Sequence, residues 1–153
     1  MGLMSPLFQE VNRWHGLPTV WGRSDCMLVV ADWVERVTGR DFAADLRNRY
    51  YDEASAERVC GWVTAPVECV ASRVGDDLPR IAVEDRLPGD IAVLSFAGED
   101  GGRGHSTGAV WLGRSWVCKG VRRGAVELRH SMLEAQVLAA WRVPYGGAER
   151  GDA

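Results

Sequence analysis

Cys26 is the residue whose place in the sequence most favours chemistry. It follows a polar turn, Trp21 to Asp25, and precedes an apolar run with helical spacing. With Ser24 as the N-cap, Cys26 falls in the first turn of that helix, where unpaired N–H groups and the helix dipole stabilise a thiolate. Cysteines in such positions have pKa values of about 3.5 to 7.5, and nearby N–H groups can bind an oxyanion. Cys26 is therefore a candidate nucleophile, and a small buried side chain on an apolar helix is the alternative.

A thiol nucleophile usually works with a histidine that takes up its proton. The chain has three histidines, at positions 15, 105 and 130. His105 follows a glycine-rich loop and precedes a strand-like run, so the fold can bring it over the start of the helix. We therefore expect His105 to be the base, with a solvated loop histidine as the alternative.

The secondary structure that must position these residues changes from helices to strands along the chain. Helical spacing and cap residues predict helices over 5–16, 24–39 and 64–75, and two short ones within 40–63. After residue 80, short apolar runs between glycines predict strands within 87–96, 107–113, 115–121, 124–129 and 139–145. Helices followed by a small meandering sheet indicate an α+β fold. We expect one domain over residues 1–145 and a mobile C-terminal tail at 146–153.

Composition and charge exclude several classes of function. The net charge of −3 gives no global basic field, so we expect no nucleic-acid partner. No apolar run approaches the ~20 residues of a membrane span, so we expect no membrane anchor. Four cysteines stand at positions 26, 60, 69 and 118 without a C-x-x-C pair. Zinc sites usually contain such a close pair, so neither a metal nor another cofactor is expected.

Several stretches of the chain together resemble one known family. Residues 21–53, WGRSDCMLVVADWVERVTGRDFAADLRNRYYDE, resemble the opening of a phage-associated family of small papain-like proteins in the NlpC-type group of cell-wall peptidases. The shared features are a Trp-Gly turn, Asp-Cys at a helix start, an apolar helix ending in Thr-Gly, and an Arg/Tyr-bearing segment. The runs LPGDIAVLSF, TGAVWLGRSWVCKG and AAWRVPY resemble the strands of that group. The resemblance covers about residues 14 to 145.

The resemblance implies a papain-like (NlpC-type) fold, in which N-terminal helices pack on a small antiparallel sheet. It also implies cleavage of an amide in peptidoglycan stem peptides. Cys26 matches the nucleophile of the group, and Asp25 matches the acidic residue before it. We expect Trp21 and Gly22, together with Asp25, to bind the substrate, with Trp21 lining a groove for the substrate or for a partner protein. The alternative for Trp21 is a place in the core.

The histidine of the group has no direct match in this sequence. It normally starts the second core strand, a place taken here by Ser106 or Thr107, with His105 one or two residues earlier. The residue that orients the histidine should lie near Cys118, where the sequence has no His, Asn or Gln. A shift of one residue in a strand turns a side chain to the other face, so His105 has to be presented by a bulge or by the loop.

Two functions are compatible with these residues. The first is a cysteine peptidase or amidase that acts on peptidoglycan during phage entry. The alternative is a catalytically degenerate papain-like module that serves as a structural tail-tip or tail-assembly component. Both place the protein in the virion tail after assembly in the bacterial cytoplasm, with other phage tail proteins as partners. The displaced His105 and the missing orienting residue motivate the alternative.

Overall fold

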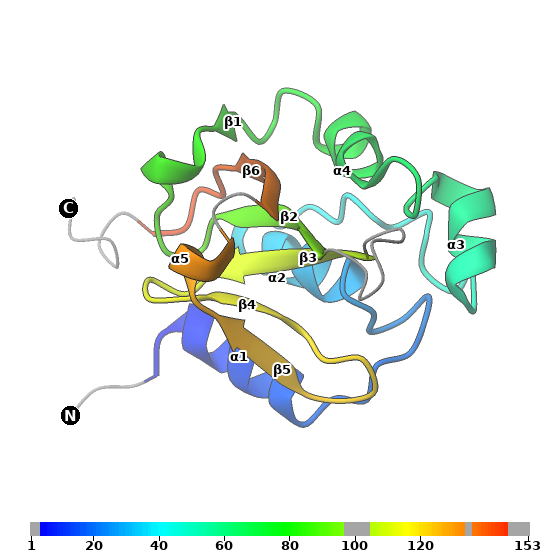
Figure 1. Cartoon of the computed structure of the whole chain (residues 1–153), viewed down its shortest axis with the longest axis horizontal. Helices are drawn as coiled ribbons and strands as arrows, with labels where there is room; N and C mark the ends of the chain where they lie inside the picture. The colour runs from blue at the N-terminus through cyan, green and yellow to red at the C-terminus, as the bar shows by residue number, and fades with distance from the viewer. Residues whose placement is uncertain (1–3, 97–104, 134–135, 147–153) are drawn as a thin grey trace.

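Helices and strands occupy the two halves of the chain that the sequence assigns to them (Figure 1). The computed structural model describes residues 4–96, 105–133 and 136–146. The helices in these ranges are α1 (Pro6–His15), α2 (Leu28–Thr38), α3 (Glu53–Cys60), α4 (Pro66–Val74) and α5 (His130–Leu133), with a 3-10 turn at Val83–Asp85. None of them has the length and hydrophobicity needed to cross a bilayer.

The strands form one antiparallel sheet in the order β1-β6-β2-β3-β4-β5. They are β1 (Arg80–Ile81), β2 (Ile91–Phe96), β3 (His105–Trp111), β4 (Trp116–Lys119), β5 (Ala125–Leu128) and β6 (Val137–Trp141). The predicted α+β class is therefore confirmed. The predicted tail at 146–153 lies outside the described residues except for residue 146.

Local signals explain most helix ends. Ser5 caps α1 because its Oγ accepts the N–H of Phe8 at 3.3 Å. α2 ends at Gly39, whose φ of 78° is left-handed and disfavours a side chain. The prediction of two short helices within 40–63 is half wrong, because residues 42–48 form turns and only α3 is a helix.

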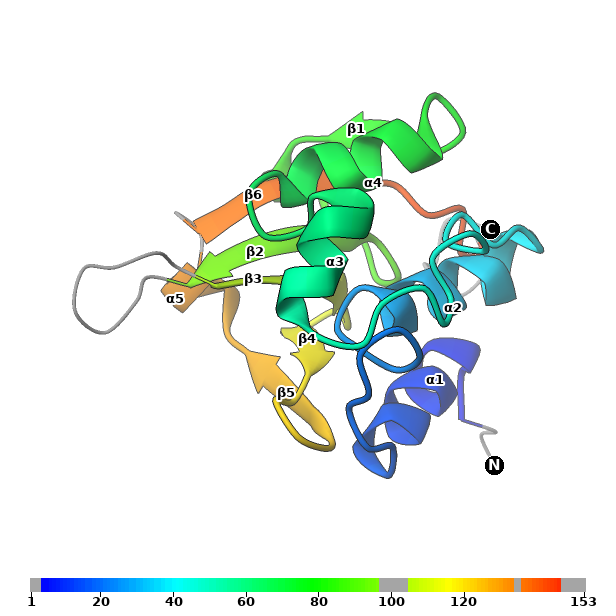
Figure 2. The ribbon, with the colours of Figure 1, turned by 90° about the vertical axis from the view of Figure 1, so that its right-hand side faces the viewer.

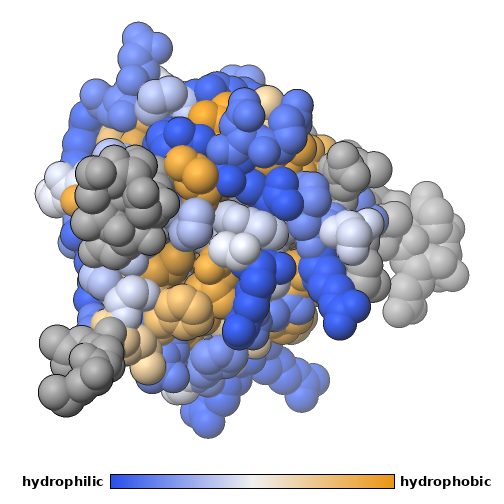
Figure 3. Space-filling view, turned by 90° about the vertical axis from the view of Figure 1, so that its left-hand side faces the viewer, coloured by the Kyte–Doolittle hydropathy of each residue, from blue (hydrophilic) through white to orange (hydrophobic). Residues whose placement is uncertain are grey.

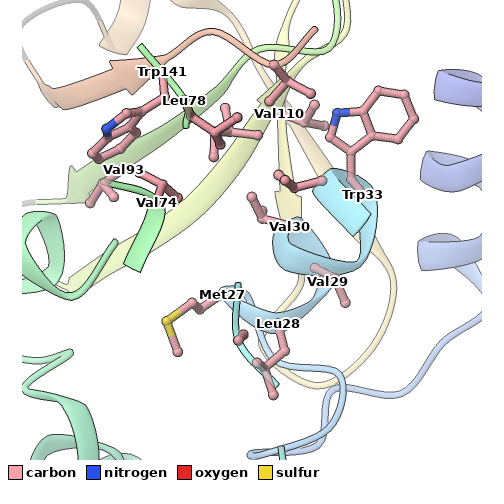
Figure 4. Packing of buried hydrophobic residues seen from close by; sticks show 14 of the residues in the cluster. Met27, Leu28, Val29, Val30, Trp33, Val74, Leu78, Val93, Val110 and Trp141 are labelled. Carbon is pink, nitrogen blue, oxygen red and sulfur yellow. The ribbon is translucent and has the colours of Figure 1, made fainter. Parts of the chain in front are cut away.

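α2 is the central helix of the core. Its side chains Val30 and Trp33 are buried in one cluster with Val93 of β2 and Val110 of β3 (Figure 4). The Trp33 Nε1–H donates to the Gly89 carbonyl at 2.8 Å, which fixes the helix to the turn before β2. α2 thereby covers one face of the sheet with an apolar layer.

The opposite face of the sheet carries a second, smaller apolar cluster. Its buried members are Ala92, Leu94, Ala109, Trp111, Trp116, Cys118 and Ala140. The outer surface is mixed: the face in Figure 3 is mostly hydrophilic, with hydrophobic residues visible between the polar ones. Figure 2 shows α3 and α4 side by side on the opposite side of the molecule. The site described below lies between the helices and the second half of the sheet.

Candidate functional site

Asp25 organises the loop that leads into α2. Its Oδ1 accepts the N–H groups of Met27 and Leu28 at 3.1 and 2.9 Å. Its carbonyl accepts the N–H of Val29 at 3.1 Å. The carboxylate therefore satisfies the first free donors of the helix, which is the task of an N-cap side chain.

Ser24 does not cap the helix, contrary to the prediction. Its Oγ donates to the Pro18 carbonyl at 2.7 Å and accepts the Val20 N–H at 3.1 Å, so the hydroxyl closes the preceding turn. α2 accordingly begins at Leu28, and Cys26 lies two residues before it rather than in its first turn. Ser and Asp are both good capping residues, so the sequence alone does not separate them.

The same carboxylate binds the Trp-Gly turn and a distant tyrosine. Asp25 Oδ2 accepts the Gly22 N–H at 2.8 Å and the hydroxyl of Tyr50 at 2.7 Å. Gly22 has a φ of 81°, and a Cβ there would lie 2.2 Å from the carbonyl oxygen of Tyr50. The Trp21 and Tyr50 rings meet edge-on, and their centroids lie 6.3 Å apart. Tyr50 is thus a structural partner of the site that the sequence analysis did not single out.

Cys26 lies where the helix start meets β3. A Cβ on Gly108 would lie 2.7 Å from the carbonyl oxygen of Cys26, so only glycine permits this approach. β3 pairs with β4 through Val110–Val117 and Trp111–Trp116, and no further pair joins these two described strands. The two strands therefore separate beside Cys26, which leaves space for a site.

The surroundings of the thiol raise its pKa. Burial raises the pKa of Cys26 to about 11, and the charge of Asp25 acts in the same direction. The Thr107 hydroxyl and the Gly108 N–H stabilise the thiolate, but by less than burial opposes it. The low pKa expected from the helix start is therefore not found, because the loss of solvent around the sulfur outweighs the nearby donors.

A cavity of about 490 Å³ opens beside Cys26. Its walls come from the loop before α2, from α3 and the segment after it, and from strands β2 to β5. Its lining includes Trp21, Asp25, Cys26, Trp62, His105, Ser106, Thr107, Cys118 and Lys119. Gly22 is not part of the lining, although Trp21 and Asp25 on either side of it are. The volume is that of a typical small-molecule or peptide side-chain site.

His105 lies at the rim of this cavity rather than against the thiol. It is exposed at the first position of β3 and stands opposite Phe96 of β2. Alternation along the strand places Ser106 on the same face as Gly108, which packs against the Cys26 carbonyl, and His105 on the same face as Thr107, whose hydroxyl interacts with the Cys26 thiol. No hydrogen bond joins His105 to Cys26, two residues that both lie in the described ranges. The structure thus brings both residues to one cavity without pairing them.

Cys118 occupies the position near which an orienting residue was expected. It is buried, and burial together with the nearby Cys26 raises its pKa to about 11. The Thr107 hydroxyl interacts with both thiols and donates to the Gly108 carbonyl at 3.0 Å. The group facing Cys26 is therefore a hydroxyl with a second neutral thiol behind it, and not an imidazole.

Lys119 is a buried charged residue of the cavity wall. Its ammonium group donates to the carbonyls of Leu17 and Gly124 and to the Thr19 hydroxyl. Burial lowers its pKa, and the charges of Arg123 and Arg13 add to this effect. These contacts tie β4 to the loop after α1, so Lys119 shapes the wall.

Among the described residues, no group of three or more His, Cys, Asp or Glu side chains has the arrangement of a metal site. Comparison with known proteins gives one match. A model of a domain of unknown function, DUF6950, matches residues 4–143. No curated protein and no solved structure matches the chain.

Proposed function

The chain belongs to the DUF6950 family, and we propose that it is a catalytically degenerate papain-like module that serves as a structural component of a phage tail. One observation supports the proposal that the chain has lost catalytic activity. The Cys26 thiol faces the Thr107 hydroxyl and has a pKa raised to about 11, so at neutral pH it is protonated. Without a base in contact, such a thiol is a poor nucleophile. The papain-like assignment and the tail location rest on the sequence resemblance.

The arrangement of β3 gives the physical reason for this loss. Ser106 or Thr107 takes the place at which the histidine of the resembled group was expected, and a hydroxyl cannot act as the base that an imidazole would supply. Cys118 stands where a histidine partner would need an oriented hydrogen-bond acceptor. Both substitutions keep the packing of the site, since serine and cysteine are small. The fold and its cavity can therefore persist without turnover.

The test combines activity and location. Purified protein is incubated with peptidoglycan, and release of soluble fragments is compared with a Cys26→Ala variant. We expect no release by either protein, and we expect the chain to be found in purified virions by mass spectrometry. Fragment release that depends on Cys26 would refute the degenerate module. Absence from virions that otherwise carry a complete tail would refute the structural role.

A second candidate is the cysteine peptidase or amidase acting on peptidoglycan stem peptides. The observation in its favour is the cavity of about 490 Å³, which both Cys26 and His105 line. Catalytic contacts can tighten only when substrate binds. In that case, His105→Ala should abolish Cys26-dependent fragment release, while His130→Ala should leave it unchanged because His130 does not line the cavity.

A further inference from the structure

β3 and β4 run side by side over only part of their length. Within the described residues they pair at Val110–Val117 and Trp111–Trp116, next to the turn that joins them. Further from that turn, β3 pairs with β2 alone down to His105, and β4 pairs with β5 alone up to Lys119. Each of the two strands therefore has a free edge, and residues of both edges line the cavity beside Cys26.

On β3, the free edge presents the backbone of Ser106. Successive residues of an antiparallel strand direct their N–H and C=O groups alternately to the two sides. The Trp111 N–H donates to the Asp90 carbonyl at 2.8 Å, so the backbone groups of Trp111 face β2. The pairing with β2 continues without a register shift to His105. Ser106, an odd number of residues before Trp111, therefore directs its N–H and C=O away from β2 and into the gap.

On β4, the free edge presents the backbone of Lys119. The Gly120 N–H donates to the Gly124 carbonyl at 2.8 Å, so the backbone groups of Gly120 face the β5 side. Lys119, the residue before it, therefore directs its N–H and C=O to the β3 side. In the part of the chain that the structure describes, no strand pairs with Ser106 or Lys119 on these sides. The two edges are thus open to a ligand that has peptide groups of its own.

The buried charged groups of the cavity wall are already satisfied by this chain. The ammonium group of Lys119 has three donors, and two carbonyls and one hydroxyl accept them. The Asp25 carboxylate accepts four hydrogen bonds. Among the described lining residues, the other acidic and basic side chains are Glu53 and His105, and both are exposed. The described wall therefore offers an occupant no buried charge that still needs a partner.

The rest of the wall is mainly apolar. Trp21 and Trp62 contribute aromatic surface to it. Val121 and Val126 also line the cavity, although they are 93% and 44% exposed to solvent. Exposed apolar side chains gathered at a cavity are typical of an interaction site. The group that fills this cavity should accordingly be apolar and uncharged.

We propose that the cavity binds an extended segment of a partner protein and takes up one apolar side chain of it. Successive residues of the segment pair with Ser106 on one side and with Lys119 on the other, as in strand addition. An acyl chain would fill the cavity but leave these backbone groups unpaired, at a cost in free energy. A peptidoglycan stem peptide brings carboxylates, for which the described wall has no free cation. The segment would belong to another tail component, so the inference rests on the structural role proposed above.

The experiment titrates the isotope-labelled full chain with a blocked peptide, acetyl-alanyl-leucyl-alanyl amide, and follows it by NMR. We expect saturable shifts of the Ser106 and Lys119 amide resonances and slower hydrogen exchange at both N–H groups. Replacing leucine by glutamate, or by N-methyl-leucine without its N–H, should weaken binding at least about fivefold, which corresponds to the loss of about one hydrogen bond. Octanoate and alanyl-D-isoglutamine are the competing ligands and should bind more weakly than the leucine peptide.

Two variants of the chain test the two halves of the proposal. Ser106→Pro removes an N–H that points away from β2, so the ladder to β2 is kept and peptide binding should fall at least about fivefold. Val126→Glu places a charge at the cavity and should weaken binding similarly. Leu138→Glu is its matched control, because Leu138 is 45% exposed on β6 and does not line the cavity. Val126→Glu also keeps the test decisive if the proline variant does not fold.

Several outcomes would overturn the proposal. They are the absence of shifts at Ser106 and Lys119, equal binding of the N-methylated peptide, and tighter binding of octanoate or alanyl-D-isoglutamine. Failure of peptide binding by a chain that is present in virions would overturn this inference alone. Peptidoglycan cleavage that depends on Cys26 would instead refute the proposed function, whatever the peptide does.

Discussion

The carbonyl oxygen of Cys26 packs against Gly108, close to the point where β3 leaves β4. A Cβ at position 108 would lie 2.7 Å from that oxygen and 3.1 Å from Cγ2 of Val30. This contact sets the distance between the start of α2 and the sheet. It therefore also fixes how the sulfur of Cys26 lies relative to the Gly108 N–H and the Thr107 hydroxyl.

Gly108→Ala tests this contact. The added methyl group must push the helix start away from β3, so we expect the free energy of unfolding to fall by about 1–3 kcal/mol. Urea denaturation followed by circular dichroism measures the change. Gly16→Ala is the matched control, because nothing lies within 4 Å of its added Cβ and its φ of −92° suits any residue. An equal loss in both variants would contradict close packing at Gly108.

Alkylation of Cys26 should be slow at neutral pH and rise with pH. Because the pKa of Cys26 is about 11, the thiolate fraction and the rate with iodoacetamide should increase about tenfold per pH unit up to that value. Cys60, with a pKa of about 7, is the internal comparison and should react readily at neutral pH. Peptide mapping separates the two sites. A rate for Cys26 that levels off below pH 8 would show that its thiolate is stabilised after all.

Ser106→His should supply the base that the site lacks. Ser106 lines the same cavity as Cys26, so an imidazole at this position is expected to reach the thiol and take up its proton. We expect the iodoacetamide rate of Cys26 at neutral pH to rise by at least about tenfold. His105→Ala is the control and should leave that rate unchanged. If His105→Ala lowers the rate instead, His105 already acts on the thiol.

Tyr50→Phe removes one hydrogen bond to a buried carboxylate. The hydroxyl of Tyr50 donates to Asp25 at 2.7 Å, and its loss should lower the free energy of unfolding by about 1.5–3 kcal/mol. Tyr51→Phe is the matched control, since Tyr51 is 74% exposed and should tolerate the change. Thermal and urea unfolding both report the difference. Equal stability of the two variants would mean that water replaces the Tyr50 hydroxyl at no cost.

Stability should also depend on pH through Cys26. The pKa of its thiol rises from an ordinary value of 9.0 to about 11 in the folded chain. The folded state therefore holds this proton more tightly than the unfolded state does. The resulting stabilisation is complete below about pH 9 and is lost as the pH rises toward about 11. The difference in urea midpoint between the unmutated chain and Cys26→Ser should shrink over this range, and a constant difference would argue against it.

Sequence reasoning found the elements with strong local signals. Ser5, Gly39 and Gly75 mark helix ends that the structure contains. The change from helical spacing to short apolar runs after residue 80 located five of the six described strands. The two-residue strand β1 was missed because its only support is pairing with β6, a contact far along the chain. The turns at 42–48 were read as a helix because local composition does not report tertiary packing.

The site was less predictable than the fold. Spacing could place Cys26 near a helix start, but it could not show that burial dominates the pKa of the thiol. The choice between Ser24 and Asp25 as the cap depended on a preceding turn that binds the Ser24 hydroxyl and leaves the Asp25 carboxylate to cap the helix. Tyr50 reaches the site through a long-range contact, for which one sequence contains no signal. The resemblance, by contrast, placed the third residue of the site near Cys118.

The place of β6 between β1 and β2 has a consequence for synthesis of the chain. β2 exposes unpaired backbone groups along one edge until residues 137–141 have left the ribosome and paired with it. The nascent chain must therefore keep this edge from pairing with other strands until β6 has been made. A nonsense mutation just before β6 should lead to aggregation of the product, even though every residue around Cys26 has been made.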